Sequence, residues 1–85
     1  MTIRFHERAL NELMVLIQTQ PKKALKVLRL LELLRRDPKH SQLGKVEKLR
    51  HLEGYSIRVD HEHRLIFSLE KHWINVYSLL GHYED

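Results

Sequence analysis

Five side chains in the second half of the sequence have the chemical types that RNA cleavage without a metal requires. They are a carboxylate, two guanidiniums, an imidazole and a phenol: Glu47, Arg58, Arg64, His82 and Tyr83. When the 2′-hydroxyl of RNA attacks its neighbouring phosphate, a base must take the hydroxyl proton, cations must stabilise the phosphorane, and an acid must protonate the departing 5′-oxygen. Carboxylate, guanidinium and imidazole groups supply those functions. The same types also occur as ion pairs and exposed side chains, so a structural role stays open at this stage.

Residues 53–70 contain both arginines and read as a β-hairpin. Apolar residues recur at every second position on either side of a polar D-H-E-H break: Tyr55, Ile57 and Val59, then Leu65, Phe67 and Leu69. Such alternation is typical of strands with one buried face. The hairpin therefore places the two arginines on neighbouring strands.

The register of this hairpin follows from its apolar side chains. An odd-numbered loop, residues 61–63, keeps them all on one face, whereas an even-numbered loop mixes the two faces. The predicted cross-strand pairs are Val59 with Leu65, Ile57 with Phe67 and Arg58 with Ile66. This register sends Arg58 and Arg64 out of the opposite face, where two guanidiniums make a place for an anion.

Basic residues are dense just before the hairpin. Residues 39–52 carry Lys45, Lys48 and Arg50 around one acid, Glu47, and show no clean period. We interpret these three bases as candidate contacts to a phosphate backbone. Glu47 itself is either a proton acceptor or a plain ion-pair partner.

The first half of the sequence predicts two amphipathic helices. Their apolar residues recur at helical spacing: Ala9, Leu10, Leu13, Met14, Leu16 and Ile17 within residues 7–18, and Ala24, Leu25, Val27, Leu28, Leu31 and Leu34 within residues 22–36, with Leu30 and Leu33 widening the second stripe. Pro21 suits the first position of the second helix, and Asp37-Pro38 ends it. A basic row on the polar side of that helix is either a solvated face or a contact for a polyanion or an acidic partner: Lys22, Lys26, Arg29 and Arg36.

Two further segments read as short strands. Residues 2–5 form an edge strand or the lead into the first helix, and residues 73–80 form a strand antiparallel to the one before it. The predicted fold class is α+β in the order β-α-α-β-β-β, with two N-terminal helices packed on the apolar face of a small antiparallel sheet. The 85 residues are expected to form a single domain, residues 1–85.

Bulk composition narrows the classes of function. The net charge of +4 favours polyanions such as RNA as partners. The absence of cysteine excludes a disulfide framework and a thiolate metal site, and fits a reducing cytosol. The N-terminus does not resemble a signal peptide and the apolar runs are too short to span a bilayer, so we predict a cytoplasmic protein with no membrane contact.

The segment His61-Glu62-His63 superficially suggests metal ligands. These are alternate residues of a loop, with no cysteine and no further ligand close in the sequence, which makes a poor zinc site. We therefore predict no metal site and no cofactor.

Two motifs carry a family resemblance. One is E-K-L-R-H-L-E-G-Y-S-I-R-V-D-H-E-H-R-L-I-F, which begins at Glu47, and the other is L-L-G-H-Y, which ends at Tyr83. On these motifs the chain resembles the RelE/ParE superfamily of bacterial toxin–antitoxin toxins, in particular its YoeB/Txe branch. Ile57 stands where that family commonly has a second arginine, and Glu84-Asp85 extends beyond the terminal H-Y.

The resemblance implies a RelE-like microbial ribonuclease fold and a definite activity. That activity is mRNA cleavage in the ribosomal A site, which inhibits translation and is itself inhibited by a cognate antitoxin protein. The toxin is expected as a homodimer or within a toxin–antitoxin hetero-oligomer. By motif, the resemblance assigns Glu47 as general base, Arg64 as the transition-state cation and His82 as general acid. It also implies that Arg58 grips the phosphate and that Tyr83 orients the substrate.

Two other functions stay open on the sequence. A protein of the same fold can bind RNA or the ribosome without cleaving it. A ParE-like gyrase inhibitor shares the fold class, but that function leaves the joint presence of Glu47 and His82 unexplained.

Overall fold

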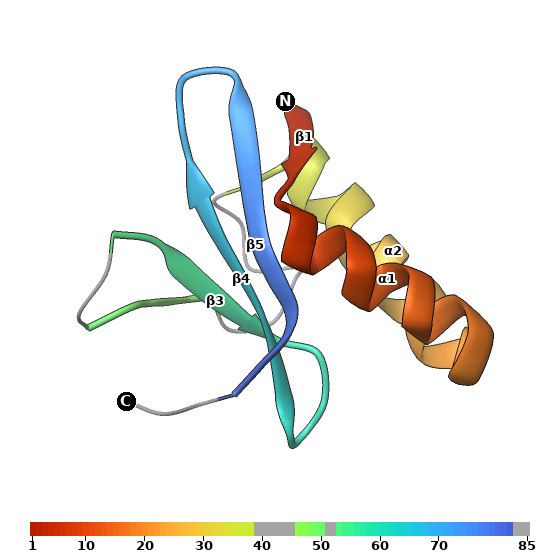
Figure 1. Ribbon diagram of the computed structural model, residues 1–85. Coiled ribbons are helices and arrows are strands. Elements are labelled where there is room, and N and C mark those ends of the chain that lie inside the picture. The colour runs from red at the N-terminus through yellow and green to blue at the C-terminus, as the bar shows by residue number, and fades with distance from the viewer. Residues whose placement is uncertain (39–45, 51–52, 83–85) are drawn as a thin grey trace.

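The computed structural model describes residues 1–38, 46–50 and 53–82, except for the side chain of His82. Its elements follow one another as β1 (Thr2–Phe5), α1 (Glu7–Thr19), α2 (Pro21–Arg36), β2 (Val46–Lys48), β3 (Tyr55–Arg58), β4 (His63–Leu69) and β5 (Trp73–His82). In this described part of the chain, five strands form one sheet in the order β1-β5-β4-β3-β2. Both helices lie on one side of the sheet (Figure 1).

The predicted α+β class is confirmed, with two differences in the sheet. The first is β2, which pairs antiparallel with β3 and lies in a stretch where the sequence predicts no strand. A strand of three residues is too short to reveal a period of two. The second is β1, which pairs in parallel with β5, so the sheet is mixed and not wholly antiparallel. The long connection through both helices makes that parallel pairing possible.

The two helices begin and end close to their predicted limits. α1 extends one residue further than predicted, to Thr19. Pro21 is the first residue of α2, where its missing N–H costs no hydrogen bond. The helix stops after Arg36, as the Asp37-Pro38 pair predicts, because the residue before proline avoids helical geometry. Among the described residues, neither helix combines the length and the apolarity that a membrane crossing requires.

One face of the hairpin supplies the centre of the core, as its alternation predicts. The fully buried side chains on that face are Ile57, Val59, Leu65 and Phe67. The buried stripes of the two helices pack against them, with Leu16 from α1 and Val27 from α2 near the middle. Tyr55 and Leu69 are only partly buried and close the core at one end.

The helices bury narrower stripes than their sequences predict. Three of the six predicted core residues of α1 are about half exposed, namely Leu10, Met14 and Ile17. Three predicted core residues of α2 are also exposed, namely Leu25, Leu28 and Leu33. The prediction that these six are core residues is wrong. Each helix packs on the sheet and on the other helix along one side, and no further layer of the described chain covers its remaining apolar side chains.

The hairpin register differs from the predicted one by two residues. Ile57 pairs with Leu65 and Arg58 pairs directly with Arg64, whereas the predicted partner of Arg58 is Ile66. A shift of two residues preserves which face each side chain occupies, so the predicted apolar face is still correct. The turn is centred one residue earlier in the chain than predicted, and Asp60 organises it. Its Oδ1 accepts hydrogen bonds from the amides of residues 62 and 63, at 2.9 and 2.8 Å.

A partly buried polar cluster joins α2 to this turn. The Lys23 ammonium lies 2.7 Å from Asp60 Oδ2 and 2.7 Å from Nδ1 of His63. The Lys23 ammonium, with help from the amides of Glu62 and His63, holds the pKa of Asp60 well below its ordinary value. The carboxylate therefore stays ionised and anchors the turn to the helix.

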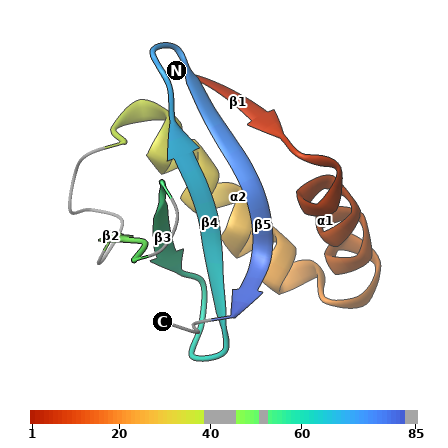
Figure 2. The same ribbon diagram turned by 60° about the vertical axis from the view of Figure 1, so that its left-hand side comes forward.

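A carboxylate of α1 accepts hydrogen bonds from the part of β5 that β1 does not pair with. β1 pairs with β5 only as far as Val76, and beyond it α1 lies along the strand, while α2 lies behind the sheet (Figure 2). There Glu12 Oε1 accepts a hydrogen bond of 2.8 Å from the Leu79 amide and one of 3.1 Å from the Ser78 hydroxyl. The free edge of β5 is thus satisfied by a side chain.

Substitution Glu12→Ala is expected to lower the free energy of unfolding by about 1 to 3 kcal/mol, because it leaves a strand amide without its acceptor. Glu12→Gln keeps one acceptor oxygen and should cost less. Denaturant unfolding followed by circular dichroism measures both. Glu7→Ala, on the exposed first turn of the same helix, is the control and should cost less than about 1 kcal/mol. Equal losses for Glu12→Ala and Glu7→Ala would contradict the role of Glu12 at the β5 edge.

Substitution Asp60→Asn should make the free energy of unfolding less dependent on pH in the acidic range. Because the folded pKa of Asp60 is lowered, its contribution is complete above the ordinary pKa of aspartate, about 4, and is lost as pH falls through the lower folded value. The wild type should exceed Asp60→Asn by about 1 kcal/mol at neutral pH. Unfolding curves measured from pH 7 down to about 2.5 should show this difference shrinking only below about pH 4. A difference that stays constant over that range would rule out the Lys23–Asp60 ion pair as its source.

Candidate active site

Arg64 lies at the centre of a hydrogen-bonded group on the sheet face that points away from the helices. Its side chain is 5% exposed, although it carries a full charge. Its Nε donates to Ser56 Oγ at 3.0 Å, and one terminal nitrogen lies 3.2 Å from Glu47 Oε1. One hydrogen bond at Nε and one ion pair at a terminal nitrogen therefore restrict the orientation of this guanidinium.

Strand pairing explains why these residues meet. Glu47 of β2 is directly opposite Ser56 of β3, and Arg58 of β3 is directly opposite Arg64 of β4. Residues opposite each other in an antiparallel pair share a face, and side chains two residues apart do as well. All of these side chains therefore leave the sheet on the same side. The structure brings together Glu47, Arg58 and Arg64, as the sequence predicts.

Arg58 differs from Arg64 in that it is exposed. Two guanidiniums opposite each other repel unless an anion compensates them. Glu47 neutralises Arg64, and no ion pair of Arg58 occurs within the described residues. The face consequently presents one positive charge to solvent beside a neutralised, buried one.

The other predicted contacts are less close to this group. Lys48 pairs with Tyr55, so its side chain leaves β2 on the face opposite to that of Glu47. Arg50 is exposed just beyond β2. Lys45 and Tyr83 lie outside the described residues, as does the side chain of His82.

The end of β5 runs beside Arg64. Gly81 is opposite Arg64, and the backbone of His82 is opposite His63, the chain neighbour of Arg64. The pairing of β4 with β5 shifts register on both sides of Ile66, and such bulges are common next to active sites. A Cβ at Gly81 would lie 2.7 Å from Ile66 Cγ1 and 3.0 Å from the Arg64 carbonyl oxygen. Glycine at this position therefore allows β4 and β5 to approach closely. The predicted site residues His82 and Tyr83 follow directly in the chain.

The aromatic side chains of the sheet have separate surroundings. Tyr55 stacks on Phe67 with ring centroids 5.7 Å apart, and the Tyr77 hydroxyl lies 2.8 Å from Ser68 Oγ. Trp73 is 37% exposed, with the Arg4 guanidinium 4.5 Å from its ring centroid. Trp73 is accordingly the most exposed of the three, and the Arg4 guanidinium covers one face of its ring.

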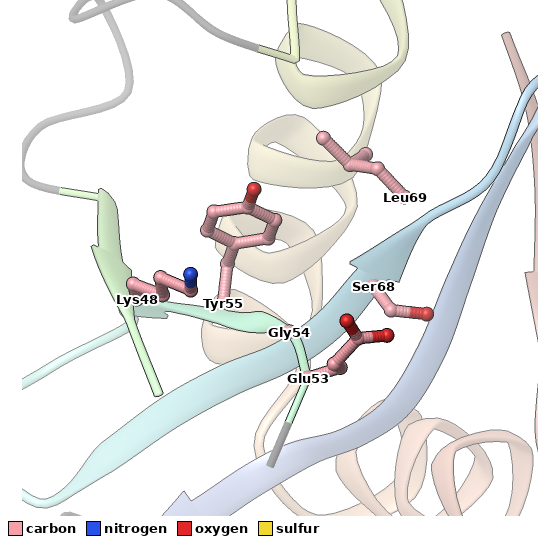
Figure 3. A pocket seen from close by; sticks show the side chains of 6 residues that line it. All are labelled: Lys48, Glu53, Gly54, Tyr55, Ser68 and Leu69. Atoms are coloured by element: carbon pink, nitrogen blue, oxygen red, sulfur yellow. The ribbon is translucent and has the colours of Figure 1, made fainter. Parts of the chain in front are cut away.

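Two hollows lie at the edge formed by β2, β3 and β4. Figure 3 shows the first, with a volume of about 160 Å³, which is lined by Lys48, Glu53, Gly54, Tyr55, Ser68 and Leu69. The second, about 330 Å³, is lined by Pro38, Val46, Lys48, Tyr55 and Leu69. Neither is lined by Glu47, Arg58 or Arg64. These two hollows therefore lie apart from the group formed by Glu47, Ser56, Arg58 and Arg64.

Ser56 is the member of this group that the sequence patterns do not single out. It is 2% exposed and is the direct partner of Arg64 Nε. Its position between Tyr55 and Ile57 puts it on the arginine face, and a small polar residue there is the signal that marks it. Within the described residues, no group of three or more metal-ligating side chains occurs.

Several known proteins share this fold and this sequence pattern. The YoeB dimer from Staphylococcus aureus is 33% identical, covers 98% of both chains and superposes with a TM-score of 0.87. The toxin of the heterotetrameric YoeB–YefM complex from the same organism is 30% identical over 98% of both chains, with a TM-score of 0.84. A YoeB/ParE toxin from Agrobacterium tumefaciens, 22% identical over 98% of this chain and 100% of its own, has a TM-score of 0.87 and shares the fold. Among curated proteins the chain has no significant match by sequence.

The sequence pattern of one family covers almost the whole chain. Residues 5–83 match the family described as the YoeB-like toxin of the bacterial type II toxin–antitoxin system. The match includes Glu47, Ser56, Arg58 and Arg64 and extends through the end of β5. The resemblance to the RelE/ParE superfamily is thereby confirmed, and the chain belongs to the YoeB-like toxins of bacterial type II toxin–antitoxin systems.

Proposed function

We propose that this toxin is an endoribonuclease that cleaves mRNA in the ribosomal A site and so inhibits translation. The observation that carries the proposal is the Glu47–Arg64 ion pair, held with Ser56 beside Arg58 on one face of the sheet. It joins a carboxylate that can take a proton to guanidiniums that can bind a phosphate. Cleavage by the 2′-hydroxyl of the RNA itself requires that combination.

In the proposed reaction, Glu47 takes the proton of the 2′-hydroxyl while that oxygen forms a bond to phosphorus. Arg64, with Arg58 beside it, stabilises the negative charge on the phosphorane oxygens. The bond between phosphorus and the 5′-oxygen then breaks, and His82 donates a proton to the departing oxygen. The products are a 2′,3′-cyclic phosphate and a 5′-hydroxyl, and both protons are accounted for.

The remaining candidate residues are proposed to hold the RNA on either side of the cleaved bond. Tyr83 orients the substrate, and Lys45, Lys48 and Arg50 contact its backbone. An RNA strand that passes around the edge of β2 would meet Lys48 on one face and Glu47 on the other. The edge position of β2 in the sheet supports that path.

The partners proposed for this chain follow from its relatives. The S. aureus YoeB structures include a dimer and a heterotetramer with YefM. We extend both to this protein, with a cognate antitoxin as partner and assembly as a homodimer or a toxin–antitoxin hetero-oligomer. Its place of action would be the cytoplasm, where the translating ribosomes are.

The proposed acid and base predict opposite changes in the pH dependence of cleavage. A general base must be deprotonated, so Glu47→Gln should lose the rise of the rate with pH. A general acid must be protonated, so His82→Ala should lose the fall of the rate at high pH. Each substitution should lower the maximal rate about 10²- to 10⁴-fold. Single-turnover cleavage of ribosome-bound mRNA, mapped by toeprinting, measures the profiles. Two unchanged profiles would remove both residues from the roles proposed here.

Arg58→Ala should weaken substrate binding without disturbing the fold. Because Arg58 is exposed, its removal should leave the free energy of unfolding within about 0.5 kcal/mol. It should reduce the slope of log affinity against log salt by about one for ribosome-bound mRNA. Lys26→Ala removes the same charge from the exposed side of α2 and should leave that slope unchanged. Equal effects of the two substitutions would mean that net charge, and not the Arg58 position, governs binding.

Two outcomes would replace the nuclease proposal. Salt-sensitive binding to translating ribosomes without any cleavage product would indicate a binding protein of the same fold. Growth arrest accompanied by DNA damage, with intact mRNA, would indicate a gyrase inhibitor.

A further inference from the structure

A second group of polar and aromatic side chains lies where β1, β5 and β4 are neighbours in the sheet. Trp73, Asn75 and Tyr77 occupy alternate positions of β5, and the residues between them are buried in the core. Asn75 is opposite Ser68, which lies four residues from Arg64 on β4. Because alternate residues of a strand share a face, this group lies on the same side of the sheet as Arg64. Figure 2 looks onto that side, with α2 behind the sheet.

Hydrogen bonds join this group across three strands. Asn75 is 2% exposed, and its Oδ1 accepts a hydrogen bond of 2.7 Å from Arg4 Nε. Its Nδ2 donates to Glu70 Oε1 at 2.7 Å and to Ser68 Oγ at 3.3 Å. The same Ser68 Oγ lies 2.8 Å from the Tyr77 hydroxyl oxygen. These contacts restrict the orientations of Arg4 and Tyr77, so less side-chain entropy remains to be lost when a ligand binds.

The part of this group that solvent reaches consists of flat side chains. Trp73 is 37% exposed, and the guanidinium of Arg4, whose side chain is 46% exposed, lies 4.5 Å from its ring centroid. His6 is exposed just beyond β1, and its ring centroid lies 4.4 Å from that of the partly buried Tyr77. We call these four residues the aromatic strip: Arg4, His6, Trp73 and Tyr77. Because Glu70 neutralises Arg4 at 3.1 Å, the strip offers flat surface more than charge.

The aromatic strip continues the face that carries the site arginines. Ser68, which contacts Tyr77, lies about 13 Å along β4 from Arg64. A stacked nucleic-acid strand advances about 3.4 Å per nucleotide, so this distance corresponds to about four nucleotides. Between the two lie the partly buried Ile66 and Gly81, which has no side chain. Within the described residues, no helix covers this path (Figure 2).

We propose that the aromatic strip binds bases of single-stranded RNA a few nucleotides from the bond that is cleaved at Arg64. Every base has a flat face that stacks on aromatic rings and on the plane of a guanidinium, whatever the sequence. Arg58 would hold phosphates while Trp73 and Tyr77 hold bases, so the two parts of the face take different parts of one polymer. Continuity with the two arginines favours RNA over a protein as the ligand. The inference rests on the proposed function for its ligand and adds residues to which that function assigns no role.

An RNA that cannot be cleaved tests the aromatic strip. The probe is a fluorescent 2′-O-methyl RNA of about 12 nucleotides, whose blocked hydroxyls cannot attack phosphorus. In fluorescence anisotropy, Trp73→Ala should weaken binding about tenfold through the loss of base stacking, with an unchanged slope of log affinity against log salt. Arg58→Ala should instead reduce that slope by about one. Trp73→Phe keeps an aromatic ring and should bind within about threefold of the wild type.

Val15 provides the matched control for the loss of exposed apolar surface. It is 55% exposed and lies on α1, on the helix side of the molecule. Val15→Ala should change binding of the RNA less than about twofold. Equal effects of Trp73→Ala and Val15→Ala would refute the strip. A salt slope that falls in Trp73→Ala as it does in Arg58→Ala would also refute it, because stacking does not release counterions.

Tyr77 separates ring stacking from hydrogen bonding. Tyr77→Phe keeps the ring and removes the contact with Ser68, and it should bind the RNA within about threefold of the wild type. Tyr77→Leu keeps apolar bulk without the ring and should weaken binding at least about fivefold. Circular dichroism checks that both variants are folded. Equal losses in the two variants would trace the effect to the Ser68 contact and overturn stacking on Tyr77.

Binding and cleavage are measured separately, so the strip and the nuclease can fail independently. Glu47→Gln should lose cleavage on the ribosome, yet its binding of the uncleavable RNA should still depend on Trp73. Dependence on Trp73 together with intact mRNA on ribosomes would support the strip and reject the nuclease. Absence of saturable RNA binding by the wild type would overturn the strip, while toeprinting still decides cleavage. A dimer that dissociates in Trp73→Ala with unchanged RNA binding, seen by analytical ultracentrifugation, would make the strip a protein contact and end the proposal.

Discussion

The buried guanidinium of Arg64 is the constraint on which the arrangement of β2, β3 and β4 depends. A charge with only 5% of its side chain exposed is costly unless other groups compensate it. Ser56 of β3 and Glu47 of β2 supply that compensation, so one side chain from β4 reaches across two neighbouring strands. The short strand β2 is thereby attached to the sheet by an ion pair as well as by its backbone. Stability and the candidate site consequently depend on the same few atoms.

The two faces of the sheet carry different kinds of side chain. One side packs against the helices through apolar side chains, while polar ties at its margins, Glu12 to β5 and Lys23 to Asp60, fix where each helix lies. Within the described residues, no helix covers the other side, which carries Arg58 and Arg64 on a pair of strands. Side chains carried by strands are held more precisely than side chains on loops, which suits the proposed contact with an RNA strand.

Sequence patterns predict features that depend on period and miss those that depend on a single contact. Alternation identifies the hairpin and its buried face, because Ile57, Leu65 and Phe67 fill one side of the pleat. The same pattern misplaces the pairing of Arg58, since the Asp60 contacts that set the position of the turn leave no periodic trace.

The helices and the site likewise combine features that a periodic pattern predicts with features that it misses. Helical spacing locates α1 and α2 but cannot show that Leu10 and Met14 stay uncovered, because exposure depends on how many layers pack around a helix. The meeting of Glu47, Arg58 and Arg64 is predictable from motif and register, whereas Ser56 becomes visible only once the register is known.

The sheet also joins the start of the chain to its last described strand. Arg4 of β1 donates to the Asn75 side chain at 2.7 Å, across 71 residues, and β5 lies between β1 and β4. While the chain is being synthesised, β1 therefore has no neighbour to pair with until β5 has left the ribosome. The five-stranded sheet of the described residues is thus completed only by its last strand to be synthesised.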